Sequence, residues 1–271
     1  MFDGVVVAVD GTRAGNEAGR QAANLVAPGG LIRLVGVADP YSESINEWGG
    51  EALLVADAAS RDDAPARMRT ALLDAVARSL DALRVQLPAG LRVDADIVEG
   101  RVRDVLQAAA TDADLIALGD HGRRRIPGII AASTVTEMLH RSACSVLISR
   151  PCFDPARFPA RIAVAVDGSG PSLRALETGV AIAGAGDAVA HLEAVVAGRG
   201  ADAVATVVNE RGGVPVNVLP GRAVPALIDV GDRVDLIVLG AQGHTGAKAV
   251  GSVAERVAHR TNASVLVVRP G

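Results

Sequence analysis

The second half of this chain repeats the first half. Three pairs of segments match in the same order: 7–12 (VAVDGT) with 164–169 (VAVDGS), 118–122 (LGDHG) with 239–243 (LGAQG), and 145–151 (SVLISRP) with 264–270 (SVLVVRP). Each segment has the length of a buried strand or of a strand that ends in a glycine turn. The duplication therefore predicts two copies of one α/β unit rather than one large sheet.

Length and composition agree with two folded domains, which we place at residues 1–151 and 160–271. The chain has 271 residues, of which 49% are hydrophobic and 21% charged, so each copy can bury a core. A net charge of -4 argues against broad nucleic-acid binding. No apolar run approaches the roughly 20 residues of a membrane span, and no signal-peptide pattern opens the chain. We expect a cytoplasmic protein without membrane insertion.

Each copy alternates short apolar runs with helical periodicity, which is typical of βαβ units on a parallel sheet with helices on both faces. In the first copy we expect strands at 4–9, 31–37, 92–98, 114–118 and 145–149, and helices at 17–26, 65–86, 102–110 and 134–141. In the second copy we expect strands at 160–167, 188–196, 214–219, 235–239 and 264–268, and helices at 172–184, 201–211, 222–230 and 252–260.

The two copies differ between their second and third strands. The spacing of matching residues falls from 157 at Asp10 and Asp167 to 121 at Gly100 and Gly221, so the second copy is about 36 residues shorter there. The first copy uses this length for a loop at 41–63 and a long amphipathic helix. A loop of that length is either mobile or a functional cover, and the sequence favours neither.

One carboxylate follows the first strand of each copy. Ligands of open parallel sheets bind outside the carboxyl ends of the strands, where the strand order reverses. Asp10 and Asp167 stand at that edge and could accept hydrogen bonds from a sugar hydroxyl or a base amino group. An Asp that caps the following helix or turn is the alternative interpretation.

A second motif combines a glycine turn with the start of a helix. In the first copy Gly119-x-x-Gly122 is followed after nine residues by Ala132-Ser133, and in the second copy Gly240-x-x-Gly243 is followed after seven by Gly251-Ser252. Glycine lets main-chain N–H groups approach an anion, and a helix N-terminus adds positive potential. The motif predicts a phosphate site, although tight turns with a Ser N-cap would produce the same pattern.

These motifs together resemble the universal stress protein family in its tandem two-domain form. The resemblance implies Rossmann-like domains, each with an open, mainly five-stranded parallel sheet. It also implies a stress-response or sensor role and binding of ATP or another adenine nucleotide, with or without Mg²⁺. Carried over residue by residue, the adenosine part would contact Asp10 and Val37, or Asp167 and Val195. The phosphates would contact Gly119, Gly122 and Ser133, or Gly240, Gly243, Gly251 and Ser252.

Both copies depart from the family pattern. The family pattern is Gly-x2-Gly-x9-Gly followed by Ser or Thr. The first copy has Ala132 in place of the third glycine but keeps the nine-residue spacing. The loop of the second copy is two residues short, which would move its donors relative to a phosphate. We therefore favour the first copy as the nucleotide site. Arg123, Arg124 and Arg125 could neutralise phosphates or form a solvated basic loop.

The sequence contains no catalytic or metal motif. It has no P-loop, no H-E-x-x-H, no G-x-S-x-G and no Gly-x-Gly-x-x-Gly after the first strand, and Cys144 and Cys152 lack the spacing of metal ligands. We expect a binding protein rather than an enzyme. The alternatives are an adaptor of the same fold that binds no nucleotide, and a weak ATPase. Its other contacts would be an unknown protein partner and a dimer-like pairing of the last strands, within one chain or between two.

Overall fold

The computed structural model describes residues 1–39, 64–120, 134–152, 157–185, 190–198, 200–210, 214–242 and 250–270. The elements of the first half are β1 (Phe2–Val9), α1 (Arg13–Ala23), β2 (Val26–Ala38), α4 (Ala64–Arg84), β3 (Arg92–Glu99), α5 (Val102–Ala109), the 3-10 helix η2 (Ala110–Asp112), β4 (Leu115–Gly119), α6 (Thr134–Arg141) and β5 (Ser145–Ser149). Those of the second half are β6 (Arg161–Ala165), α7 (Gly170–Ala185), β7 (His191–Ala197), α8 (Ala201–Glu210), β8 (Val216–Leu219), α9 (Ala223–Val230), β9 (Leu236–Gly240), α10 (Ser252–Arg260) and β10 (Ser264–Val268).

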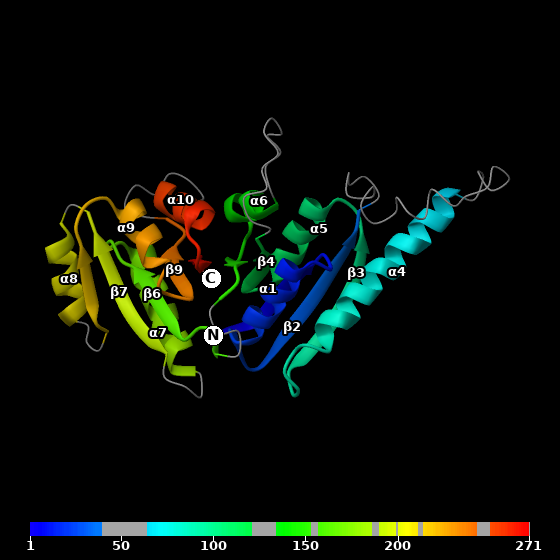
Figure 1. Ribbon diagram of the computed structural model, residues 1–271, viewed down its shortest axis with the longest axis horizontal. Helices are drawn as coiled ribbons and strands as arrows, with labels where there is room; N and C mark the ends of the chain where they lie inside the picture. Colours follow the sequence, from blue (N-terminus) through cyan, green and yellow to red (C-terminus); the bar gives the residue numbers. More distant parts are fainter. Residues whose placement is uncertain are drawn as a thin grey trace.

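The strands form one ten-stranded sheet in the order β3-β2-β1-β4-β5-β10-β9-β6-β7-β8. Within each half the five strands are parallel, which confirms the predicted fold of each copy. The expectation that the copies do not form one large sheet is wrong, and of the two alternatives for the last strands the structure has the pairing within one chain. The last strands, β5 and β10, pair antiparallel, with Leu147 opposite Leu266. Each last strand is the edge of its half, and pairing satisfies main-chain groups that would otherwise be unpaired. The halves lie side by side along the sheet (Figure 1).

Helices cover both faces of the sheet, and their buried residues divide into two cores. One core contains side chains from α1, α4, α7 and α8, for example Ala18, Leu83 and Ile182. The other contains side chains from α5, α6, α9 and α10, for example Leu106, Met138 and Val257. Each core extends across both halves because the sheet between them is continuous.

Three predicted boundaries near the start of the chain are wrong. The helix expected at 17–26 begins at Arg13, because the Thr12 side chain caps it by accepting a hydrogen bond from the Gly15 amide. It ends at Ala23, and strand β2 begins at Val26 rather than at 31. The strand continues through Gly29, which has a φ of 81°, and its register with β1 shifts there.

The shortened part of the second half is the connection between β7 and β8. Here the 10-residue helix α8 replaces the 21-residue α4. The predicted 41–63 loop lies outside the described residues. Within the described segments, no helix combines the length and apolarity needed to cross a bilayer.

Candidate functional site

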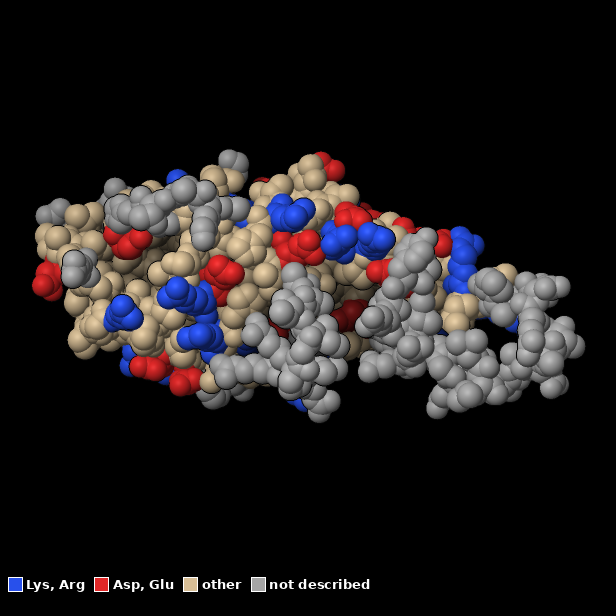
Figure 2. Space-filling view, turned by 90° about the horizontal axis from the view of Figure 1, so that it is seen from above, with Lys and Arg blue, Asp and Glu red and all other residues tan. Residues whose placement is uncertain are grey.

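The sheet order reverses between β1 and β4 in the first half and between β6 and β9 in the second. At both places two neighbouring strands continue into loops on opposite faces of the sheet, which is where open α/β folds hold ligands. Asp10 and Gly119 lie at this edge in the first half, and Asp167 and Gly240 lie there in the second. Figure 2 looks down onto the edge, where acidic and basic side chains are interspersed rather than separated.

The strand-end aspartates form the same turn in both halves. Asp10 Oδ1 accepts hydrogen bonds from the Thr12 amide at 3.0 Å and from Thr12 Oγ1 at 2.7 Å. Asp167 Oδ1 does the same with the Ser169 amide at 3.0 Å and Ser169 Oγ at 2.5 Å. The intervening Gly11 has a φ of 73°, in the left-handed region that glycine tolerates.

Neither aspartate caps its helix directly, as the alternative interpretation would have it. The hydroxyls do so: Thr12 Oγ1 accepts from the Gly15 amide at 3.1 Å, and Ser169 Oγ accepts from the Ser172 amide at 3.4 Å. Each aspartate orients the capping residue while its own side chain stays exposed at the carboxyl edge of the sheet.

The first glycine of each Gly-x-x-Gly motif has a packing role. A Cβ on Gly119 would lie 2.3 Å from the main-chain carbon of Ala14 and 2.6 Å from the Gly15 nitrogen. A Cβ on Gly240 would lie 2.7 Å from the main-chain carbon and oxygen of Pro171. Both glycines thus allow the first turn of a helix, α1 or α7, to approach the end of a strand. Access for an anion is not needed to explain them.

The start of α10 differs from the predicted Ser cap. Gly251 is the N-cap residue, Ser252 is the first helical residue, and no side chain caps the helix. The Gly251 amide donates to the Ala241 carbonyl oxygen at 2.7 Å, so this donor is already used within the protein. The amides of the first turn, beginning with that of Ser252, are therefore the donors that α10 can direct at an anion.

The two valines assigned to the base differ in accessibility. Val37, near the end of β2, is half-buried, whereas Val195, on β7, is only 2% exposed. The Val195 carbonyl oxygen also accepts a hydrogen bond from the Val166 amide at 3.0 Å. The first half therefore leaves more valine surface for contact with a planar base.

Three predicted site residues, Gly122, Ser133 and Gly243, lie outside the described residues, as do Arg123, Arg124 and Arg125. The structure thus brings together Asp10 and Gly119 around the first turn of α1 and places Val37 at the same edge of the sheet. In the second half it places Asp167, Val195, Gly240, Gly251 and Ser252 at the corresponding ends of their elements.

Sequence reasoning missed an ion pair between a residue of the first Gly-x-x-Gly motif and an arginine that follows the last strand of the first half. Arg150 Nη2 lies 2.7 Å from Asp120 Oδ2, and both side chains are largely buried, at 10% and 27% exposure. Ala241 takes the place of Asp120 in the second half, and among the described buried polar atoms Arg269 Nε has no hydrogen-bond partner. The sequence signal was the match of Arg150 to Arg269 combined with the mismatch of Asp120 and Ala241.

Two histidines bridge the halves. Each lies in the last turn of its helix, His140 in α6 and His259 in α10. In the structure His140 Nε2 lies 3.2 Å from Glu255 Oε1, and His259 Nε2 lies 3.3 Å from Thr136 Oγ1. Each contact joins α6 to α10 across the boundary where β5 pairs with β10, which we call the seam. The histidines thus add contacts between the two halves.

The described residues offer no reactive thiol and no metal centre. Burial is the main cause that raises the pKa of Cys152 to about 12, with Glu17 adding to the effect, and burial also raises the pKa of Cys144. No group of three or more His, Cys, Asp or Glu side chains suited to a metal ion occurs in the described part of the chain.

Comparison with known proteins gives one family and one fold. The sequence profile of the universal stress protein family matches residues 1–150 and 209–269. A universal stress protein from Archaeoglobus fulgidus is 18% identical, with a TM-score of 0.69 and coverage of 98% of this chain and 96% of the other. A putative universal stress protein from Pseudomonas aeruginosa is 16% identical, with a TM-score of 0.60 and coverage of 99% and 94%. The cytoplasmic domain of a prokaryotic cation chloride cotransporter is 12% identical, with a TM-score of 0.54 and coverage of 98% and 95%. No curated protein sequence matches significantly.

Proposed function

Because the chain belongs to the universal stress protein family, we propose that it binds an adenine nucleotide at the carboxyl edge of its sheet and acts in a stress response as a sensor. ATP is the nucleotide we favour, with Mg²⁺ as its counterion. The observation that carries the proposal is the repeated Asp-Gly-Thr/Ser turn, which holds an exposed carboxylate beside the point where the strand order reverses.

The first half has the better groups for adenosine. Thr12 engages one oxygen of Asp10, so the carboxylate has a fixed orientation from which it can accept a hydrogen bond from a ribose hydroxyl. Val37 offers apolar surface at the neighbouring strand end. Gly119, Gly122 and Ser133 would hold the phosphates through main-chain amides, as the family resemblance implies.

In the second half one of the candidate phosphate donors is already used within the protein. The Gly251 amide is already hydrogen-bonded to Ala241, which leaves the Ser252 amide and hydroxyl as the first donors of α10. Asp167 and Gly240 would complete a weaker site together with Gly243. We therefore propose tighter binding in the first half and weaker binding in the second.

The same geometry supports binding without a dedicated catalytic centre. A general base must reach the proton that it removes, and Asp10 Oδ1 already accepts two hydrogen bonds from Thr12. We propose that the protein acts through a protein partner in the cytoplasm. The last strands are paired within the chain, so a homodimer would form through other surfaces.

Calorimetric titration and thermal unfolding with MgATP test the proposal. A ligand selective for the folded state adds about 2.7 kcal/mol of stability at a hundredfold excess over its Kd. Asp10→Ala should remove most of this gain and Asp167→Ala a smaller part, each compared with its own ligand-free protein. Asp74→Ala, which changes an exposed carboxylate on α4, is the matched control. If wild type showed neither heat nor stabilisation, the adaptor alternative would stand instead.

A further inference from the structure

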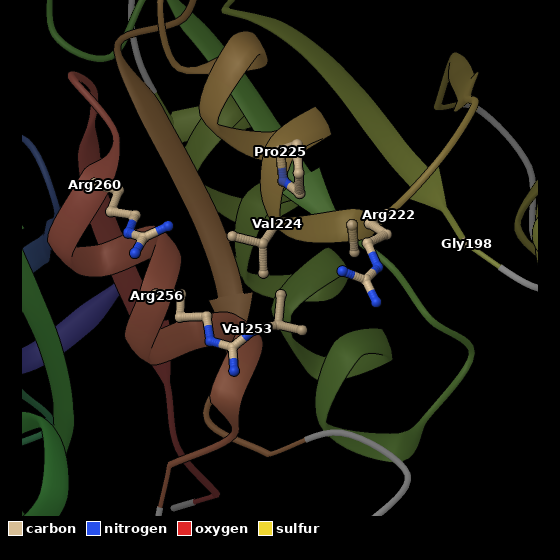
Figure 3. A pocket seen from close by; sticks show the side chains of 8 residues that line it. Gly198, Arg222, Val224, Pro225, Val253, Arg256 and Arg260 are labelled. Carbon is tan, nitrogen blue, oxygen red and sulfur yellow. The ribbon is translucent and has the colours of Figure 1, made fainter.

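A cleft of about 560 Å³ lies between α9 and α10 in the second half. It is lined by Gly198, Arg222, Ala223, Val224, Pro225, Val253, Arg256 and Arg260. Figure 3 shows Arg256 and Arg260 along α10 and Arg222 across the cleft, at the start of α9. The volume is that of a small-molecule site.

The cleft is separate from the residues proposed for the nucleotide. Of those that the structure describes in this half, namely Asp167, Val195, Gly240, Gly251 and Ser252, none lines it. It begins next to them, at Val253, and continues along α10 to Arg260.

The charge of the cleft is strongly positive. Three guanidinium groups line it, and no carboxylate occurs among its described lining residues. Arg256 and Arg260 are four residues apart on one helix, and like charges at this spacing destabilise a helix. The described lining of the cleft therefore favours a ligand that carries an anionic group.

At the corresponding positions of the first half a carboxylate lies among the arginines. The repeat aligns Arg101, Glu137 and Arg141 with Arg222, Arg256 and Arg260. There Glu137 Oε1 lies 3.8 Å from Arg103 Nη1 and 3.9 Å from Arg141 Nε. In the second half Arg256 replaces Glu137 and Val224 replaces Arg103, so this cleft has a third arginine at the first position and an apolar wall at the second.

The walls of the basic cleft are apolar. Val224 and Pro225 on α9 line it together with Val253, which is 37% exposed. A ligand that suits both features has an apolar body and an anionic group. We propose that this cleft binds a small organic anion, with its phosphate or carboxylate on Arg222, Arg256 and Arg260 and its apolar part against the valines.

Titration of the full chain with phenyl phosphate, followed by calorimetry, tests the proposal. Arg256→Glu copies the first-half pattern and should lower the affinity at least tenfold, whereas Arg256→Lys should retain most of it. Phenol, which lacks the anionic group, should bind at least tenfold more weakly than phenyl phosphate.

Two outcomes would overturn the proposal. The first is that wild type and Arg256→Glu bind phenyl phosphate with equal affinity, while both proteins show a cooperative thermal unfolding transition. The second is loss of phenyl phosphate binding in Asp167→Ala, because that would place the anion in the nucleotide site. Failure of MgATP to bind would leave this measurement unaffected, so the two proposals fail independently.

Discussion

Arg150 forms an ion pair with Asp120, with Nη2 and Oδ2 2.7 Å apart, at the end of strand β4. The same guanidinium donates to the Ala258 and Ala263 carbonyl oxygens of the second half, the latter at 2.9 Å. One side chain therefore connects the start of the first glycine motif to the end of α10. A movement of Asp120 would therefore displace Arg150 and its hydrogen bonds to the second half.

Replacing Arg150 should destabilise the protein strongly. Arg150→Met leaves the Asp120 carboxylate without this partner and two buried carbonyl groups without donors, so the free energy of unfolding should fall by about 3 kcal/mol. Chemical denaturation measures this loss. Arg269→Met is the matched control, and we expect about 1 kcal/mol because Ala241 offers no carboxylate. Equal losses in the two variants would contradict a special role for the ion pair.

Substitutions of the motif glycines should act through packing. Gly119→Ala places a methyl group against the main chain of Ala14 and should cost about 3 kcal/mol of stability, since neither segment can shift cheaply. Gly184→Ala, in α7, meets no atom within 4 Å and should stabilise by about 0.5 to 1 kcal/mol. Thermal unfolding without nucleotide checks both values. An unchanged Tm for Gly119→Ala would show that the turn is free to move.

The strands and helices were largely predictable because their apolar runs are continuous or periodic. Strands β5 and β10 and helices α6 and α10 have the predicted bounds. The start of α1 was missed because it depends on a side-chain cap at Thr12, which hydrophobic periodicity does not reveal. The sequence could not decide whether the last strands pair within one chain or between two chains, because an edge strand forms the same hydrogen bonds in both cases.

The candidate site was less predictable than the fold. Asp10 and Asp167 were found because they follow buried strands, and the structure places both at the carboxyl edge. The packing role of Gly119 could not be predicted from the sequence. A glycine that makes room for a neighbouring helix looks the same in the sequence as a glycine that makes room for a phosphate. The basic cleft was missed because Arg222 and Arg256 are distant in sequence and come together only through the packing of α9 on α10.

The thiol of Cys152 should be inert in the folded protein. Burial and Glu17 raise its pKa to about 12, so at pH 8 the thiolate is scarcely populated. We expect alkylation by iodoacetamide at pH 8 to be at least a hundredfold slower than in the unfolded chain. Mass spectrometry of a Cys144→Ala variant measures this rate for Cys152 alone.

The sign of the pH effect follows from the raised pKa. The folded protein holds the Cys152 proton more tightly than the unfolded chain, whose thiol has a pKa of about 8.5. The resulting stabilisation is complete below that value and is lost as the pH rises toward 12. Wild type should therefore lose more stability than Cys152→Ala between pH 8 and pH 10.5. Parallel pH profiles would show that the thiol has its ordinary pKa.

The seam should make the two halves unfold together. Leu147 and Leu266 pair across β5 and β10, and both side chains are fully buried. Leu266→Ala should cost about 3 kcal/mol through the cavity it leaves. Because the sheet is continuous, hydrogen exchange should accelerate in β1 of the first half as well as in β6 of the second. Leu192→Ala, on β7 away from the seam, is the control and should affect the second half more than the first. If Leu266→Ala accelerated exchange only in β6, the halves would be independent folding units despite their shared sheet.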